Sequence, residues 1–593
     1  MQRRSEAQEA ERSALLGDAA RSPGGPESPG NSKGVDVPNI PVSLWRGIAI
    51  GLSLGILIFL QATNMSGMTM IQGQVADDLD AHAAASWFTA AYLIPLSSFA
   101  SVAGRLATVF SPRGLVLPVG ALFAAGALVT ARATSFAALV LGRALAGTGG
   151  AGVLGLCVIF VLELTTRRRR GLFIALVNTG FTAGVAVGAV VYGALLPVMG
   201  WRPIFMWQIP VSLIGGVASF VSLPSSMKPG GGDLLHKPGT TKQKLARIDY
   251  LGAFLLASSF PFPTPAEQCF TIVLFLYSLA ADVHPLTLGL SLASLAAFLV
   301  VEYRVAADPI IPLPVLSSRG VLLSCLAQLG LMTARWSLLF YAPVFALAVR
   351  GAPPAAAGSV LVPTNAGFAV GGFLAGALHV RRAGSFWLPC VVVTAVFGLS
   401  LFLLGLVASP EASLGPFVAV VFLNGLATGA ALNYSLAHVL HLSHKDTEYV
   451  STSLLGTFRG FGGSFGTSIG GGIFFRFLSR ALTAGFADLE ARHGREGRGL
   501  TPEHTRLVTR LLGAPGLVYS GDLSDEEQQV AISGYSGAIR GVWHAAALLT
   551  VAVVAVQAAA GWTAPGDRDV EYSVDEEDQA HAALLENEGL GEA

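Results

Sequence analysis

The chain has 593 residues, of which 52% are hydrophobic and only 12% are charged. Soluble domains carry about 25% charged residues, so most of this chain is excluded from facing water. Lysine plus arginine and aspartate plus glutamate number 37 each, which gives no basis for binding nucleic acid. The sequence has no spacing typical of a nucleophile with its base, a phosphate-binding loop or a metal site. We therefore expect neither an enzyme nor a bound cofactor or metal.

Fourteen apolar runs are each long enough for a membrane-spanning helix, which needs about 20 apolar residues. The sequence therefore predicts an all-α membrane protein with 14 transmembrane helices in the lipid bilayer. Three prolines and Glu267 interrupt the seventh run at 259–269. The interruption is either a re-entrant or extramembrane excursion of the chain or an error in the gene model. In chain order the runs centre on 46–74, 84–103, 115–130, 136–162, 171–196, 203–223, 250–280, 285–301, 320–346, 355–379, 386–408, 414–440, 452–476 and 541–561.

The distribution of basic residues predicts the orientation of these spans. With the N-terminus in the cytosol, the cytosolic loops hold sixteen lysines and arginines and the short outer loops hold three, so both ends are expected to be cytosolic. The first predicted part is a disordered cytosolic tail at 1–40, and it is followed by a first six-helix bundle at 41–223. Residues 224–310 would form a cytosolic loop and two extra helices, with the doubtful insert at 259–269. A second six-helix bundle at 311–561 would include a long outer loop at about 477–540, and an acidic cytosolic tail would follow at 562–593.

The fourth run contains an arginine among glycines, in the stretch GRALAGTGGAG at 142–152. A charge there costs at least about 2.5 kcal/mol, so Arg143 is expected to face the protein interior or a water-filled path. The alternative is an arginine near a helix end that extends its charge to the membrane surface. The glycines, Gly147 among them, would let a neighbouring helix approach closely.

These motifs resemble those of the major facilitator superfamily. RALAGTGGAG is similar to its fourth-helix motif, and GRLATVFSPRG (104–114) to its loop between helices two and three. NTGFTAGVAVGAVVYG (178–193) sits where exporters carry a glycine-rich fifth helix. FRGFGGSFGTSIGGG (458–472) resembles the penultimate helix of the fungal fourteen-span drug:proton antiporter branch. The resemblance covers about 45–561.

The resemblance implies two six-helix bundles around a central cavity, two extra helices between them, and transport by alternating access. It assigns proton handling to Arg143. It also implies a loop that changes conformation, with Gly104, Arg105 and Arg113, and glycines for helix packing, which are Gly147, Gly180, Gly184, Gly188, Gly462 and Gly466.

Departures from the family pattern concern the acidic residues. Asn64 stands where this branch usually has an aspartate, and Thr108 where the loop motif usually has an acid. Outside the insert, Glu163 is the only acid well inside an apolar run, so it is the candidate to carry the proton. The alternative is that Glu163 pairs with the basic loop Arg167–Arg170.

A polar face on the first span predicts part of a substrate cavity, because polar side chains in lipid often mark transport pathways. The alternative for the asparagines is hydrogen bonding between helices. Such a cavity suits uncharged or weakly basic amphipathic molecules. The candidate lining residues are Gln61, Asn64, Met68, Gln72, Arg335, Asn365, Asn424 and Asn433.

Three functions remain open for this sequence. The first is proton-coupled efflux of small molecules such as drugs or fungal secondary metabolites. The second is a vacuolar carrier of basic amino acids, and the third is a sensor that keeps the fold without transport. Glu11, Leu15 and Leu16 spell an acidic dileucine signal that sorting adaptors would read, which favours the vacuole, whereas exporters of this branch favour the plasma membrane.

Overall fold

The computed structural model describes residues 43–164, 167–225, 318–380, 385–443, 448–493 and 500–561, and isolated helical positions between 289 and 300. Nearly all of these residues are helical. The seventh and eighth predicted spans, the insert at 259–269, both tails and the signal at Glu11, Leu15 and Leu16 lie outside the described residues.

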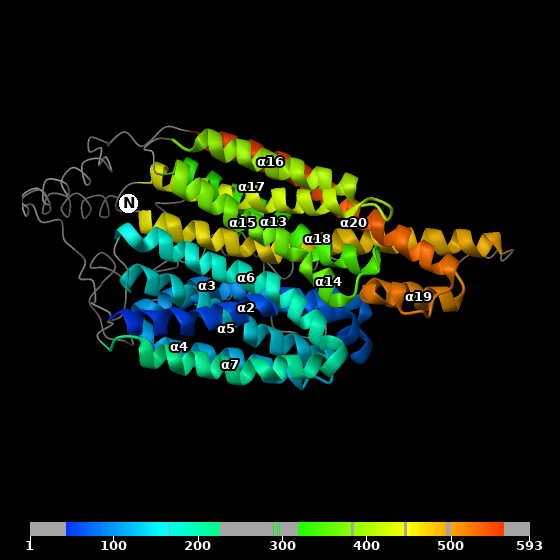
Figure 1. Ribbon diagram of the computed structural model, residues 1–593, viewed down its shortest axis with the longest axis horizontal. Coiled ribbons are helices and arrows are strands. Elements are labelled where there is room, and N and C mark those ends of the chain that lie inside the picture. The colour runs from blue at the N-terminus through cyan, green and yellow to red at the C-terminus, as the bar shows by residue number, and fades with distance from the viewer. Residues whose placement is uncertain are drawn as a thin grey trace, which may run out of the picture. The chain divides into compact units, whose positions relative to one another are not determined.

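The helices fall into two groups along the chain, coloured blue to cyan and green to red in Figure 1. The first group is α2 (Leu44–Asp78), η2 (His82–Ala84), α3 (Ala85–Val109), α4 (Pro112–Ala131), α5 (Phe136–Leu164), α6 (Arg167–Met199) and α7 (Trp201–Ser222). The second is α13 (Arg319–Ala348), α14 (Pro354–Ser359), α15 (Leu361–Leu374), the π-helical turn η5 (Ala375–His379), α16 (Trp387–Val407), α17 (Leu414–Leu442), α18 (Glu448–Arg492), α19 (Pro502–Gly513), η7 (Pro515–Tyr519) and α20 (Asp525–Ala559).

Ten helices in the described ranges are long and apolar enough to cross a membrane. They confirm an all-α, multi-pass membrane protein, and the count of fourteen stays a prediction. The expected second and penultimate spans are the helices α3 and α18. These two helices pack against each other between the two groups, so part of their surface contacts protein instead of lipid.

Both groups have the same packing scheme. In the first, α2 packs on α6 and α7, α3 packs on α5, and α4 packs on α5 and α7. In the second, α13 packs on α18 and α20, α15 packs on α17, and α16 packs on α17 and α20. Each group is therefore a six-helix bundle, in which α2 corresponds to α13 and α5 corresponds to α17. The two bundles also meet where α6 contacts α14 and α15.

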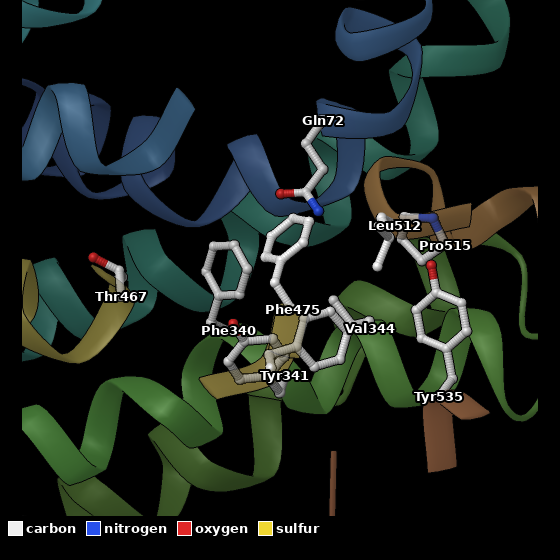
Figure 2. A pocket seen from close by; sticks show the side chains of 10 residues that line it. Gln72, Phe340, Tyr341, Val344, Thr467, Phe475, Leu512, Pro515 and Tyr535 are labelled. Atoms are coloured by element: carbon white, nitrogen blue, oxygen red, sulfur yellow. The ribbon is translucent and has the colours of Figure 1, made fainter. Parts of the chain in front are cut away.

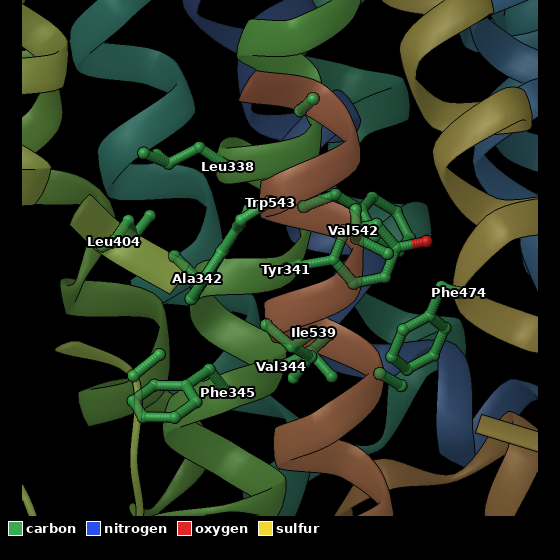
Figure 3. Packing of buried hydrophobic residues seen from close by; sticks show 14 of the residues in the cluster. Leu338, Tyr341, Ala342, Val344, Phe345, Leu404, Phe474, Ile539, Val542 and Trp543 are labelled. Atoms are coloured by element: carbon green, nitrogen blue, oxygen red, sulfur yellow. The ribbon is translucent and has the colours of Figure 1, made fainter. Parts of the chain in front are cut away.

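Aromatic side chains fill the core of the second bundle (Figure 3). The ring of Phe345 on α13 stacks on that of Phe417 on α17, with centroids 4.9 Å apart, and both pack near Trp543 on α20. All three side chains are buried. Because lipid tails are as apolar as these side chains, close packing accounts for the association better than exclusion from water does.

Tags at the two chain ends test the predicted orientation. Because sixteen basic residues lie in the predicted cytosolic loops and three in the short outer loops, reporter tags at both ends should be inaccessible from outside intact cells. Accessibility is measured with an impermeant antibody or protease, before and after permeabilisation. An externally accessible tag at either end would refute this topology.

The segment expected as a long outer loop, 477–540, is largely helical. The penultimate helix α18 continues to Arg492, and α20 begins at Asp525 with a capping box formed by Ser524 and Glu527. A buried carboxylate joins the helices of this segment. One oxygen of Glu490 accepts hydrogen bonds from the amide and hydroxyl of Thr501, at 3.0 and 2.6 Å, and from Nδ1 of His504 at 2.5 Å.

These hydrogen bonds from Thr501, with a smaller contribution from His504, lower the pKa of Glu490 to about 2. Because the pKa is lower in the folded protein, the stabilisation is present at neutral pH and is lost as the pH falls from about 4.5 to about 2. We expect Glu490→Gln to raise the rate of proteolysis of the 493–525 segment several-fold at pH 7. Glu503→Gln is the control, because Glu503 is exposed on α19. Equal proteolysis of both variants and the wild type would contradict this account.

Candidate functional site: a buried arginine network

Arg143 on α5 is fully buried and is bonded through all three guanidinium nitrogens. Its Nε donates to the carbonyl of Phe88 on α3 at 2.9 Å. Its Nη1 donates to Oδ1 of Asn64 on α2, and its Nη2 lies 3.5 Å from the Asn64 carbonyl. The guanidinium carbon lies 4.6 Å from the ring centroid of Tyr92, in a cation–π contact.

The network continues from Asn64 to two further helices. Nδ2 of Asn64 donates to Oε1 of Gln208 on α7 at 2.6 Å, and Nε2 of Gln208 donates to the hydroxyl of Tyr192 on α6 at 2.5 Å. The chain of hydrogen bonds thus joins α2, α3, α5, α6 and α7. A change of charge or hydration at Arg143 would therefore reach five helices of the first bundle.

No carboxylate in the described part of the chain forms an ion pair with Arg143. Oxygen atoms of amides and of the backbone, together with aromatic faces, are its only counterparts there. Such dipoles offset only part of the cost of burying a charge. The described protein surroundings therefore compensate the buried charge of Arg143 only in part.

A second buried arginine occupies the other bundle. Nη1 of Arg335 on α13 donates to the hydroxyl of Thr364 on α15 at 2.6 Å and to Oδ1 of Asn424 on α17 at 2.7 Å. Nδ2 of Asn424 then donates to Ser400 on α16 at 2.8 Å. Since α13 and α17 correspond to α2 and α5, an arginine–asparagine pair joins the first and fourth helices of each bundle. In the first bundle the asparagine is on the first helix and the arginine on the fourth, and in the second bundle the two residue types are exchanged.

The other predicted cavity residues have separate surroundings. Gln61 is fully buried, and neither of its amide atoms has a hydrogen-bond partner among the described residues. Met68 is buried in an apolar cluster of the first bundle. Asn365 is buried, and its Nδ2 has no partner in the same described ranges. Asn433 is half-buried and donates to the carbonyl of Gly429 at 3.0 Å.

Gln72 lines a small pocket where the two bundles meet (Figure 2). Its Oε1 is buried without a hydrogen-bond partner in the described part of the chain, and its amide faces aromatic side chains of α13 and α18. Residues of α19, η7 and α20 close the pocket at the predicted outer side. The remaining lining residues are Phe340, Tyr341, Val344, Thr467, Phe474, Phe475, Leu512, Pro515 and Tyr535.

Among the other candidates for proton coupling and for the conformational loop, the structure describes the side-chain contacts of Arg113 only. Arg113 donates through Nε to the carbonyl of Phe220 on α7 at 2.9 Å, and its guanidinium lies over the Phe220 ring. It therefore fixes the start of α4 to the end of α7. Gly104, Arg105 and Glu163 belong to α3 and α5, but their side-chain surroundings lie outside the described part.

Five of the six packing glycines lie against other helices. A Cβ at Gly147 would collide with the Tyr92 carbonyl. A Cβ at Gly184 would lie 2.6 Å from Ala62, and one at Gly188 would lie 2.5 Å from Thr63. In the second bundle, a Cβ at Gly462 would collide with Met332, and one at Gly466 would lie 2.5 Å from the Thr333 carbonyl. Gly180 differs, because no atom of a described residue lies within 4 Å of such a Cβ.

Four residues of these networks were not predicted from the sequence, and they are Tyr92, Tyr192, Thr364 and Ser400. Thr364 had a detectable signal, since it begins a polar pair inside the apolar stretch LVPTNAG. The tyrosines had none, because aromatic residues are common in apolar helices.

Two similar six-helix bundles of apolar helices, each with a buried arginine between its first and fourth helices, define a multi-pass membrane protein of the transporter type. The profile of the Major Facilitator Superfamily matches residues 52–467. The chain belongs to the major facilitator superfamily.

Curated relatives and a solved structure agree with this membership. The chain is 25% identical over 518 residues to "Multidrug resistance protein fnx1" of Schizosaccharomyces pombe, covering 85% of this chain and 89% of the relative. It is 25% identical over 446 residues to "Efflux pump FUS6" of Gibberella fujikuroi, covering 73% and 76%. A bacterial homologue of the human lysosomal transporter Spinster, in an inward-facing, unoccupied conformation, shares the fold with a TM-score of 0.56 at 14% identity, covering 88% of this chain and 98% of that one.

Proposed function

We propose that this chain is an efflux transporter that moves small organic molecules, such as drugs or fungal secondary metabolites, across a membrane by alternating access. Relatives named as a multidrug resistance protein and an efflux pump, each similar over most of its length, support the substrate class. The contact between the bundles at α6 and α14 supplies a surface that would open and close.

The observation that carries this proposal is the Arg143 network. The fully buried guanidinium joins α5 directly to α2 and α3, and it reaches α7 and α6 through Asn64 and Gln208. A charge buried at membrane depth is costly and commonly marks a functional site. We place proton coupling at this network. Glu163 remains the candidate proton carrier because it lies well inside an apolar run of the sequence. Its alternative role is an ion pair with the basic loop Arg167–Arg170.

The proposed cellular location is the plasma membrane, with the vacuolar membrane as the alternative. The acidic dileucine signal of Glu11, Leu15 and Leu16 supports the vacuole, where a carrier of basic amino acids would act. We favour the plasma membrane because exporters of the branch that the sequence motifs resemble are mostly found there.

A single pair of assays tests the function. The tagged chain is expressed in a yeast strain without its own drug pumps, and cellular accumulation of a drug panel is measured beside uptake of arginine and lysine into isolated vacuoles. Efflux requires lower accumulation of at least one drug in cells that express the chain. Vacuolar uptake without drug efflux would favour the amino-acid carrier, and no flux in either assay would leave the non-transporting sensor.

A further inference from the structure

Arg335 is held at one corner of its guanidinium group. Both hydrogen bonds that it donates, to Thr364 and to Asn424, come from Nη1. Asn424 is itself held by Ser400, so the position of this corner is determined by four helices of the second bundle. The plane and direction of the guanidinium are therefore fixed before any ligand arrives.

The opposite edge of the same guanidinium, formed by Nε and Nη2, has no hydrogen-bond partner among the described residues. These two N–H groups point the same way and match the two oxygens of a carboxylate, so they form the edge that arginine uses for bidentate binding. Arg143 differs, because its Nε and both Nη atoms already have oxygen partners. Of the two buried arginines, Arg335 is the one with capacity for a ligand.

The charge of Arg335 has no counter-charge in the part of the protein that the structure describes. It lies near the middle of α13 and is 4% exposed. In the described helices every aspartate and glutamate lies within five residues of a helix end, and none forms an ion pair with Arg335. A buried cation without an anion is costly, and an anionic ligand would remove most of that cost.

The residue after Arg335 lies at the boundary between the bundles, because Trp336 packs in one cluster with Leu60, Met65 and Tyr92 of the first bundle. Asn365, the residue after Thr364, has a buried Nδ2 with no hydrogen-bond partner among the described residues. A second donor for an anion therefore lies on α15, adjacent in sequence to the residue that holds Arg335.

We propose that Arg335 is a specificity-determining residue that binds the carboxylate of an organic anion through its Nε and Nη2 edge. The apolar and aromatic cluster around the next residue of α13, Trp336, favours an amphipathic aromatic or alicyclic carboxylate. This assignment of substrate class rests on the proposed efflux function. It differs from the uncharged or weakly basic substrate that the sequence suggested, because the sequence did not show that the Nε and Nη2 edge of Arg335 has no partner among the described residues.

The test is ligand binding by the purified full-length chain in lipid nanodiscs. The probes are 2-naphthoate, anthracene-9-carboxylate and biphenyl-4-carboxylate, each beside its methyl ester, and the readout is the ligand-dependent rise of the unfolding temperature at pH 7. We expect at least one acid to stabilise the protein and its ester to have no effect. Arg335→Gln should weaken acid binding about tenfold or more, since it removes a charge-assisted, bidentate contact.

Two further variants complete the design. Arg335→Lys keeps the charge but has no planar fork, so it should weaken binding several-fold, and it decides the question if Arg335→Gln does not fold. Arg132→Gln is the matched control, because Arg132 is exposed at the end of α4. Esters that bind as well as acids, no acid that binds, or acid binding unchanged in the Gln and Lys variants would each overturn the assignment. Drug efflux in cells without acid binding would refute this inference alone, whereas Arg335-dependent acid binding without any flux would refute only the efflux function.

Discussion

Replacing Arg143 with alanine should abolish transport while the protein still reaches its membrane. The variant removes the group that joins α5 to α2 and α3, and it leaves Oδ1 of Asn64 and the carbonyl of Phe88 without their donor. Each buried acceptor left unpaired costs about 1–3 kcal/mol, but removal of a buried charge offsets part of that cost. The fold should therefore survive, and transport should not.

Lysine at position 143 should restore transport partly at best. An ammonium group carries the charge, but it lacks the planar set of donors that reaches the Phe88 carbonyl and Asn64 together. Efflux per molecule of surface protein is the measurement, with Arg132→Gln as the control for loss of an exposed arginine. If Arg143→Ala transports at the wild-type rate, then the buried network has no part in the cycle.

Gly147→Val should prevent accumulation of the folded protein. A Cβ at this position would collide with the backbone carbonyl of Tyr92, and a backbone atom cannot move aside without separating α3 from α5. That displacement would also move the Tyr92 ring from its place beneath Arg143. Overpacking of this kind costs about 1–3 kcal/mol and more where backbone must shift, which is a large part of the stability of a protein.

The matched control is Gly180→Val, which makes the same substitution where no atom of the described residues would lie within 4 Å of the new Cβ. The measurement is the yield of monodisperse protein after extraction from the membrane. We expect a loss of more than tenfold for the first variant and near wild-type yield for the second. Equal yields of the two variants would show that the contact between α3 and α5 is not a close-packed one.

Hydropathy was sufficient to predict an all-α, multi-pass membrane protein, because an apolar run of spanning length has few other stable structures in lipid. The order of short motifs was sufficient for the family. Hydropathy failed where a helix leaves the membrane. The outer end of α18 is a polar helix held by Glu490, in a segment that the sequence predicts as a loop.

The site was less predictable than the fold. The motif singled out Arg143 and the polar face singled out Asn64, but nothing in a single sequence shows that a residue 144 positions away, Gln208, accepts from Asn64. Likewise, the composition of α13 reveals a buried charge at Arg335 but not which edge of the guanidinium is occupied. Pairing across helices depends on their rotation and depth, which hydropathy does not encode.

The most direct test of the central claim, transport by alternating access, is to lock the contact between the bundles. At the predicted outer ends of α6 and α14, a Cβ at Gly193 would lie 2.6 Å from the carbonyl carbon of Pro354, so the two helices touch. Cysteines at the exposed positions Ala194 and Ala356 beside this contact, in a chain without its native cysteines, would be joined by a short, reducible bifunctional reagent. We predict that cross-linking stops efflux and that reduction restores it, with no effect of the reagent on either single-cysteine variant. Efflux at the uncross-linked rate by fully cross-linked protein would contradict the account.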